Sequence, residues 1–289
     1  MTRKLVVTGN CQVLALSTAL RMIFPRDAIY TYQLNLVDHS KVAAQLADAD
    51  FWIAMPYPTE NDRVRELSTT NAMYVSWPPL VFNGFHPDIV YAYRGEELFR
   101  GISDYHSAIG LWAWQRGADP FDAARLFTAE TFRALGYFDA YRADIDPLRA
   151  AFARSSLDFS GFWLRAKRMG VFMHTINHPR AEVLTLLAKL VAVELGATPD
   201  VLDEPIERYV IDELVRVVVW PVYPEIAVHL GVPGSNRFTV VNDVYRSREE
   251  FLRAQWTAYG DTDPSMVTST RPDKDLYDAV LEPMLKERS

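Results

Sequence analysis

Short apolar runs alternate with amphipathic segments over the first 80 residues of the chain. Four runs have the length and composition of buried strands: residues 4–9, 27–34, 50–56 and 71–77. Three helical segments separate them: residues 13–24, residues 37–49, where Asp38 stands at the N-cap position, and residues 61–70. This alternation predicts an α/β fold in which right-handed βαβ units build a parallel sheet flanked by helices.

The predicted sheet also indicates where a ligand binds. In open α/β sheets, ligands bind outside the carboxyl ends of the strands. Three segments follow predicted strands, namely Gly9–Gln12, Pro56–Pro58 and Trp77–His86. We therefore expect all three to point toward one edge of the sheet.

The second half of the chain is mainly helical in pattern. Four helical stretches cover residues 107–117, 122–136, 145–156 and 160–170. A short strand at 170–175 then leads through Ile-Asn-His-Pro into a long amphipathic helix at 180–196, which Gly196 ends. With no Gly/Ser-rich linker, we expect a single domain over residues 1–289. It has an α/β core over about 1–195, a helical insertion at 105–168 and a helical and loop region at 196–289.

Net charge and cysteine usage exclude several classes of protein. The 289 residues carry a formal net charge of −7, whereas surfaces that bind nucleic acid or anionic membranes need excess Lys and Arg. A single cysteine forms no intramolecular disulfide, and the basic start lacks the apolar core of a signal peptide, so we expect a cytoplasmic protein. No apolar run reaches the ~18–20 residues of a membrane helix, so we expect no membrane insertion.

That single cysteine, Cys11, stands between the first predicted strand and the first predicted helix. Unpaired N–H groups at a helix N-terminus lower a cysteine pKa and can hold an oxyanion. Gly9 permits a sharp turn, while Asn10 and Gln12 offer amides that could donate hydrogen bonds to an oxyanion. The alternative is that Cys11 is a small buried apolar residue, as most lone cysteines are.

A nucleophilic thiol needs a base, and two histidines stand in His-Pro pairs after predicted strands. These are His86 and His178, which we expect at turns on the ligand-binding edge. His106 starts a helix and is a third candidate. We predict no metal site, because His174 and His178 would share a face only in a helix, and Pro179 argues against one.

Two segments resemble the SGNH/GDSL hydrolase superfamily, which has a three-layer α/β core. Gly-Asn-Cys-Gln after the first strand is similar to its Gly-Asp-Ser opening, with Cys11 in the serine position and Asn10 in the aspartate position. Residues 175–191 resemble its last block, with His178 as the base and Thr175 where the orienting aspartate would stand. Asn83 falls where the superfamily places its oxyanion asparagine. The resemblance therefore implies a Cys–His dyad.

A second resemblance, to the WcbI-type polysaccharide biosynthesis proteins, covers about the first 190 residues. Its blocks stand here in the same order: the Asn-Cys-Gln turn, the segment 84–91 (GFHPDIVY), Tyr-His-Ser at 105–107 and Asn-His-Pro at 177–179. The resemblance implies an acetyl-CoA-dependent O-acetyltransferase acting on a sugar of a capsular or exopolysaccharide. Coenzyme A carries phosphates, which require cations nearby.

The cations that best fit coenzyme A lie in one predicted helix. Arg165, Lys167 and Arg168 stand beside Phe162 and Trp163, which could stack on adenine; a solvated helix face is the alternative. We add Gly9 and His106 to the predicted cofactor-binding residues.

Two other functions remain open. One is an SGNH-like esterase or deacetylase that uses the same Cys/His site with water as the acceptor. The other is a non-catalytic sugar-binding component of a polysaccharide assembly system, in which Cys11 is only a packing residue. Whether an acetyl-cysteine intermediate forms is also open.

Overall fold

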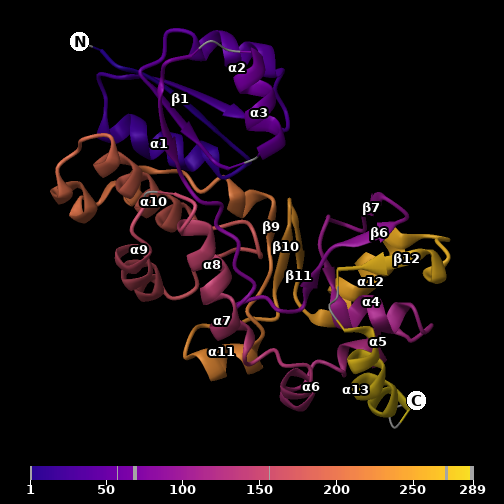
Figure 1. Ribbon diagram of the computed structural model, residues 1–289. Helices are drawn as coiled ribbons and strands as arrows, with labels where there is room; N and C mark the ends of the chain where they lie inside the picture. Colours follow the sequence, from indigo (N-terminus) through magenta and orange to yellow (C-terminus); the bar gives the residue numbers. More distant parts are fainter. Residues whose placement is uncertain (1, 57, 68–69, 156, 271–272, 287–289) are drawn as a thin grey trace. The chain divides into compact units, whose positions relative to one another are not determined.

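The computed structural model describes residues 2–56, 58–67, 70–155, 157–270 and 273–286 (Figure 1). The chain forms two compact units, each built from several separate segments. The first unit comprises Met1–Val81, Ile145–Met173 and His178–Val215. The second comprises Phe82–Asp144, His174–Asn177 and Arg216–Ser289. A single domain over the whole chain stays a prediction.

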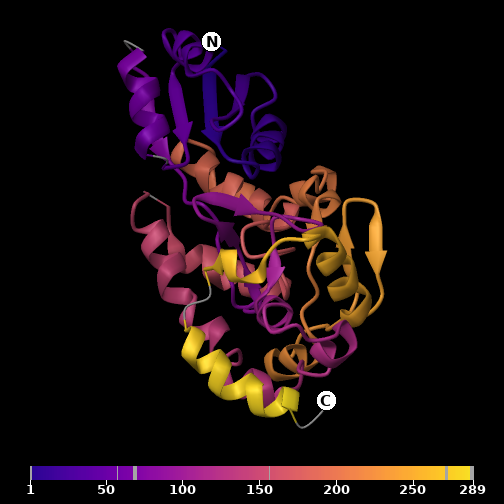
Figure 2. The same cartoon turned by 90° about the vertical axis from the view of Figure 1, so that its right-hand side faces the viewer.

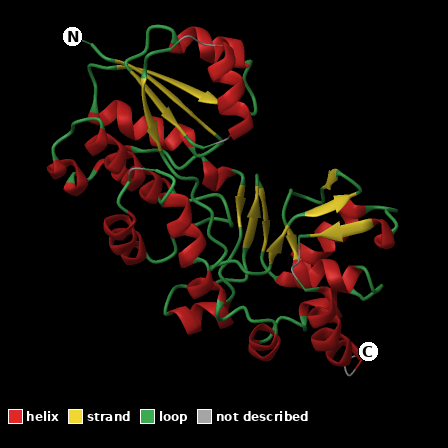
Figure 3. Ribbon diagram, viewed as in Figure 1, coloured by secondary structure: helices red, strands yellow, loops and turns green. Residues whose placement is uncertain are grey.

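The first unit contains the predicted parallel sheet, drawn in yellow in Figure 3. Its strands are β1 (Lys4–Gly9), β2 (Ala28–Gln33), β3 (Phe51–Ala54) and β4 (Met73–Ser76). All neighbours are parallel, in the order β2-β1-β3-β4. The chain therefore reverses its direction of winding between β1 and β3, which creates a crevice at the carboxyl ends of these two strands.

Helices cover both faces of this sheet, as predicted. One face packs on α2 (His39–Leu46) and α3 (Pro58–Leu67), whose Val42 and Val64 share a core with Val6 of β1. The side chains of Leu5 and Val7 point to the opposite face, which α1 (Val13–Ile23) covers, and α10 (Ala181–Glu194) packs on α1. In Figure 2 the strands lie between the dark-blue helix α1 and the purple helix α3.

Helix α10 differs from its prediction as an amphipathic helix, because nearly every side chain in it is buried. Its one lysine, Lys189, is 5% exposed and donates hydrogen bonds to the carbonyl of Glu204 and the carboxylate of Glu207. A helix that is apolar on most sides lies inside a core rather than at a surface. Gly196, with φ of 91°, follows the helix and ends it as expected.

The strand predicted at 170–175 is wrong. The segment makes only an isolated bridge between Met173 and Pro179, although Phe172 and Met173 are buried. The apolar composition of this segment indicates that it is buried, but it does not show that the segment pairs as a strand. The helix predicted at 122–136 is two helices, α5 (Pro120–Ala124) and α6 (Ala129–Ala134), because the Thr128 side chain caps the second by accepting from the Thr131 N–H.

Further helices complete the first unit. They are α8 (Ile145–Phe152), α9 (Phe159–Ala166) and the 3-10 turns η1 (Lys167–Met169), η2 (Pro199–Asp203) and η3 (Ile206–Tyr209). The turn η4 (Leu214–Arg216) spans the point where the chain passes from one unit to the other.

The second unit combines short helices with small antiparallel sheets. Its remaining helices and turns are α4 (Ala108–Trp114), α7 (Ala140–Ala143), α11 (Pro224–Leu230), α12 (Arg248–Tyr259), η5 (Pro264–Met266) and α13 (Lys274–Lys286). The strands are β5 (Ile89–Val90), β6 (Ala92–Arg94), β7 (Glu97–Phe99), β8 (His106–Ser107), β9 (Val218–Val219), β10 (Phe238–Val240), β11 (Asp243–Tyr245) and β12 (Val267–Ser269). They pair as β12-β6-β7, β11-β10-β9 and β5-β8.

A fully buried carboxylate, Asp88, joins distant segments of this second unit. It accepts hydrogen bonds from the Ile109 N–H (3.1 Å), the Tyr137 hydroxyl (2.9 Å) and the Tyr223 hydroxyl (2.8 Å). Burial raises the pKa of Asp88, and these donors, together with the Ser107 hydroxyl, oppose that rise. Asp88 thus supplies a first-turn N–H of α4 with an acceptor.

We expect Asp88→Asn to lower the free energy of unfolding by about 2–3 kcal/mol. The new amide NH₂ cannot accept a hydrogen bond, so at least one of the buried donors that now bind Asp88 would lose its acceptor. Urea denaturation followed by circular dichroism measures this change. The matched control is Asp261→Asn at an exposed aspartate, where we expect a change below about 0.5 kcal/mol. Equal effects of the two substitutions would contradict the role of Asp88.

Candidate functional site

Cys11 lies in the turn that connects β1 to α1, at the point where the sheet changes its direction of winding. Asn10 shapes this turn, because its side-chain oxygen accepts the Gln12 N–H at 2.9 Å and its carbonyl accepts the Val13 N–H at 3.0 Å. The side-chain oxygen of Asn10 therefore satisfies an N–H at the start of the helix. Its amide nitrogen is the part that could donate to a ligand.

Gln12 connects this turn to the segment that follows β4. Its side chain is fully buried, donates to the Leu80 carbonyl at 2.9 Å and accepts the Leu80 N–H at 3.1 Å. The carboxamide therefore makes the two hydrogen bonds that a neighbouring strand would otherwise make with the backbone of Leu80. The pairing confirms that Gly9–Gln12 and the segment beginning at Trp77 share the carboxyl edge of the sheet. The predicted Pro56–Pro58 turn includes residue 57, which lies outside the described residues.

Gly9 allows the indole of Trp77 to reach the β1 backbone. A Cβ atom at Gly9 would lie 2.6 Å from Cζ2 of Trp77, closer than carbon atoms approach. The Trp77 Nε1–H donates to the carbonyl of Thr8 at 3.3 Å, and the ring is fully buried. The glycine is therefore explained by the close approach of this ring.

The environment of the Cys11 thiol differs from the expectation that the helix N-terminus lowers its pKa. Burial raises the pKa of Cys11, and the N–H groups of Cys11 and Gln12 offset this only in part. The side chain is half-buried. The thiol is thus mainly protonated at neutral pH, and nucleophilic chemistry at Cys11 requires a base.

His178 is the predicted base that belongs to the same unit as Cys11. It is 9% exposed and precedes α10, the helix that packs on α1. Cys11 and His178 thus stand just before two helices, α1 and α10, that pack on each other. The role of His178 as the base stays a prediction.

The predicted coenzyme A cations lie at the end of α9 and in η1. Lys167 and Arg168 are exposed, while Arg165 forms an ion pair with Asp203 at 3.4 Å. Phe162 is fully buried and presents no face to an adenine ring, whereas Trp163 is partly exposed and stacks on Phe159. Their roles in binding stay predictions.

Arg180 is a further cation that the sequence analysis missed. It lines a cavity of about 260 Å³ together with Met169, Phe172 and Glu182, at the start of α10. Its Nε atom is buried and has no hydrogen-bond partner among the described residues. The only signal in the sequence was its position directly after the His-Pro pair.

The other predicted site residues belong to the second unit. The Asn83 amide donates to Asp144 at 3.3 Å, and its backbone N–H donates to the same carboxylate. His86 is 2% exposed, in a turn where its N–H donates to the Asn83 carbonyl at 2.7 Å. Their catalytic roles stay predictions.

His106 is fully buried, and both of its ring nitrogens have protein partners. Nε2 lies 2.9 Å from the carbonyl of Phe99 and Nδ1 lies 2.7 Å from the Tyr259 hydroxyl. A carbonyl only accepts, so Nε2 donates to Phe99 and Nδ1 accepts from Tyr259. Burial lowers the pKa of His106. These contacts give His106 a structural role, and a part in binding coenzyme A stays a prediction.

Asn177, the residue before His178, joins three segments of the second unit. Its side-chain oxygen accepts the Tyr105 hydroxyl and, at 3.3 Å, the Thr175 hydroxyl, while its amide donates to the Tyr91 hydroxyl at 2.9 Å. Tyr91, Tyr105 and Asn177 come from three separate sequence blocks of the WcbI resemblance: 84–91, 105–107 and 177–179. Sequence reasoning placed these blocks in order but did not predict that they meet.

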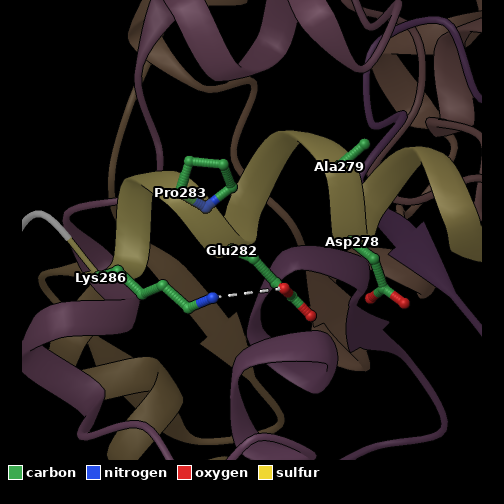
Figure 4. A pocket seen from close by; sticks show the side chains of 5 residues that line it. All are labelled: Asp278, Ala279, Glu282, Pro283 and Lys286. Atoms are coloured by element: carbon green, nitrogen blue, oxygen red, sulfur yellow. Dashed lines mark ion pairs between the residues drawn. The ribbon is translucent and has the colours of Figure 1, made fainter.

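One surface hollow of about 400 Å³ lies along α13, away from every predicted site residue (Figure 4). Its side chains are Asp278, Ala279, Glu282, Pro283 and Lys286, and Glu282 pairs with Lys286 at 3.8 Å. It is lined by a single helix, so it offers no enclosing wall for a ligand.

The profile of the family described as polysaccharide biosynthesis enzyme WcbI matches residues 4–200. The chain belongs to the WcbI family. This match includes all the sequence blocks on which the resemblance rested.

A solved structure shares the fold of this WcbI family member over its full length. It is described as WcbI, a novel polysaccharide biosynthesis enzyme, in a native form without a disulfide bond between coenzyme A and a cysteine. The TM-score is 0.75 at 16% sequence identity, over 99% of this chain and 98% of that chain. The similarity supports an α/β fold with a four-stranded parallel sheet. No curated protein matched the chain.

The described part of the chain contains no helix with both the length and the apolar character needed to cross a membrane.

We expect Gly9→Ala to lower the free energy of unfolding by about 1–3 kcal/mol, because its Cβ would displace the Trp77 ring. Urea denaturation of Gly9→Ala, Trp77→Phe and the double variant tests the cause. The smaller ring relieves the clash, so the double variant should lose less stability than the sum of the single changes. Additive losses would contradict this packing.

We expect the alkylation rate of Cys11 to keep rising above pH ~8.5, the usual pKa of a thiol, because burial raises the pKa of Cys11. The rate of Cys11 alkylation by iodoacetamide is measured between pH 6 and 10, by quenching the reaction at set times and quantifying the product by mass spectrometry. The urea-unfolded protein is the control and should titrate near ~8.5. A rate that is already maximal at pH 7 would mean that the thiolate is stabilised.

Proposed function

We propose that this WcbI family member is a coenzyme A-dependent O-acetyltransferase that acetylates a sugar hydroxyl during polysaccharide synthesis. The observation that carries the proposal is the position of its only cysteine, Cys11, at the carboxyl end of β1 and the start of α1. The family is one of polysaccharide biosynthesis enzymes, and the description of the structural neighbour associates coenzyme A with a cysteine of that protein. A CoA thioester is a natural acyl donor for such a site.

The proposed chemistry transfers one acetyl group and one proton. The Cys11 thiol gives its proton to His178 and attacks the thioester carbonyl; the C–S bond to coenzyme A breaks, and its thiolate takes the proton. A sugar hydroxyl then gives its proton to His178 and attacks the acetyl-cysteine carbonyl; the C–S bond to Cys11 breaks, and the Cys11 thiolate takes the proton back from His178. The raised pKa of Cys11 explains why this step needs a base. Thr175 replaces the orienting carboxylate, so an SGNH-like site here would be a dyad.

The turn itself offers donors for the developing oxyanion. The Cys11 N–H hydrogen-bonds to the Cys11 sulfur. In the Asn10 side chain only the oxygen has a partner among the described residues, the Gln12 N–H, so the amide nitrogen can donate to an oxyanion. The Gln12 side chain is hydrogen-bonded through both its oxygen and its nitrogen to the backbone of Leu80. We therefore assign Asn10 to the oxyanion and Gln12 to positioning the turn.

The cations of the first unit fit a phosphate-bearing donor. Lys167, Arg168 and Arg180 lie within fourteen residues of one another in sequence, and Arg180 lines a cavity that also has the apolar side chains of Met169 and Phe172. Phosphates pair with such cations, and apolar walls suit the pantetheine arm. Arg165 is less suited, because Asp203 already pairs with it.

The first test is calorimetric titration with coenzyme A and acetyl-CoA. We expect saturable binding in the micromolar range, about tenfold weaker in Arg180→Ala and Arg168→Ala because a phosphate contact is lost. Arg154→Ala, at an exposed arginine that precedes α9, is the matched control and should bind as the wild type does. Absence of binding by the folded protein would overturn the proposal.

Transfer is measured by mass spectrometry of sugars incubated with acetyl-CoA and the protein. We expect Cys11→Ala and His178→Gln to reduce acetylation by at least about 100-fold while binding of coenzyme A persists. Cleavage of aryl acetates at a rate independent of coenzyme A would instead identify an esterase. Full transfer by Cys11→Ala would exclude the acetyl-cysteine.

A further inference from the structure

Residues 174–178 form a short loop whose two ends are joined. The residues that flank it, Met173 and Pro179, make an isolated antiparallel bridge. A short closed loop has fewer conformations than an open segment, because both of its ends are fixed. All of its residues except Asn177 are buried, and the last of them is His178, the predicted base.

The side-chain amide of Asn177 is held at both of its ends. Its oxygen accepts the Tyr105 hydroxyl and, at 3.3 Å, the Thr175 hydroxyl, while its nitrogen donates to the Tyr91 hydroxyl at 2.9 Å. Side-chain hydrogen-bond networks of this kind make the segments that they join more rigid. Because the amide is restrained from both ends, it also restrains the Cα atom of Asn177.

The two tyrosines that hold Asn177 are themselves fixed within the second unit. The Tyr105 carbonyl accepts the side-chain amide of the buried Gln255 at 2.8 Å. The Tyr91 N–H donates to Oγ1 of Thr270 at 3.1 Å, and the Tyr91 carbonyl accepts the Thr270 N–H at 2.9 Å. The two tyrosine rings also pack on each other, with 5.5 Å between their centroids. Asn177 is therefore bound to residues whose own backbones are held in place.

Backbone hydrogen bonds fix the loop on the side that precedes Asn177. The Trp220 N–H donates to the carbonyl of His174 at 2.8 Å, and the Phe82 N–H donates to the carbonyl of Ile176 at 2.7 Å. The second of these carbonyls belongs to the peptide group that leads into Asn177. The backbone before Asn177 and the Asn177 side chain thus restrain the same residue.

His178 stands between this restrained asparagine and a proline. Pro179 keeps the residue before it in extended backbone conformations, because the proline ring would otherwise collide with that residue. Asn177 restrains the chain on the other side. The two neighbours together limit the directions in which the His178 imidazole can project.

We propose that Asn177 is a positioning residue, which acts through the backbone to hold the His178 imidazole in the direction that acetyl transfer requires. This inference rests on the proposed function, in which His178 is the base. Thr175 stands where the SGNH-like pattern has an orienting aspartate, and its hydroxyl donates to Asn177. The orienting role thereby passes to the asparagine. A base that is displaced by about 1 Å costs about 100-fold in rate.

The first test compares the acetyl transfer kinetics of Asn177→Ala with those of the wild type. We expect kcat to fall by about 10- to 100-fold while KM for acetyl-CoA stays within about twofold, because the base is displaced and the donor site is not. Tyr105→Phe removes a single hydrogen bond and should lower kcat by about 3- to 10-fold. Asn236→Ala, at an exposed asparagine, is the matched control and should keep the wild-type kcat.

Circular dichroism checks that each variant is folded. Tyr105→Phe keeps the test decisive where Asn177→Ala does not fold, because it removes only one contact of the amide. Wild-type kcat in both variants, together with an inactive His178→Gln, would overturn the positioning role and leave the proposed function intact.

The double variant Asn177→Ala/His178→Gln distinguishes positioning from a general loss of stability. We expect its activity to match that of His178→Gln within about twofold, since Asn177 acts through an imidazole that is already absent. A further loss as large as that of Asn177→Ala alone would mean that Asn177 acts independently of His178, and it would overturn the proposal.

Nuclear magnetic resonance tests the position of the His178 ring without any acetyl transfer. Proton–carbon spectra of protein with labelled histidines show the ring signals, and those of His178 are the ones absent from His178→Gln. We expect Asn177→Ala to shift or broaden the His178 signals and to leave those of the exposed His229 unchanged. Unchanged His178 signals would overturn the positioning role. Shifted signals, together with full acetyl transfer by His178→Gln, would support the positioning and overturn the base of the proposed function.

Discussion

The buried carboxamide of Gln12 is the contact on which the candidate site depends. It pairs with both backbone groups of Leu80, so the turn after β1 and the segment after β4 are held together at one edge of the sheet. Two buried backbone groups would lose their partners without it, which is costly in a core. Trp77 tightens the same junction by packing against Gly9. The position of Cys11 follows from these two contacts.

The Cys11 environment combines opposing electrostatic effects. Burial disfavours the thiolate, while the N–H groups at the start of α1 favour it, and burial is the larger effect. A thiol that stays protonated until a base acts is protected from unwanted oxidation and alkylation. It also makes the proposed chemistry dependent on a histidine.

The buried carboxylate of Asp88 also orders a hydrogen-bond chain inside the second unit. The Tyr137 hydroxyl donates its hydrogen to Asp88, so the Tyr277 hydroxyl donates to the Tyr137 oxygen. In the first unit, the cavity at Arg180 combines a cation with the apolar side chains of Met169 and Phe172. That combination is what the proposed function requires of a site for an anionic donor.

Local patterns in the sequence determined the parallel sheet, the Cys11 turn and the Asp38 cap, because strand alternation and capping depend on neighbouring residues. The same patterns failed at 170–175 and along α10, where burial from all sides removes the periodicity that distinguishes one element from another. Only the tertiary structure decided that Gln12 pairs with Leu80, that Asn83 orients Asp144 and that Asn177 joins Tyr91 to Tyr105. These contacts join residues far apart in sequence, and nothing in the spacing of the residues encodes them.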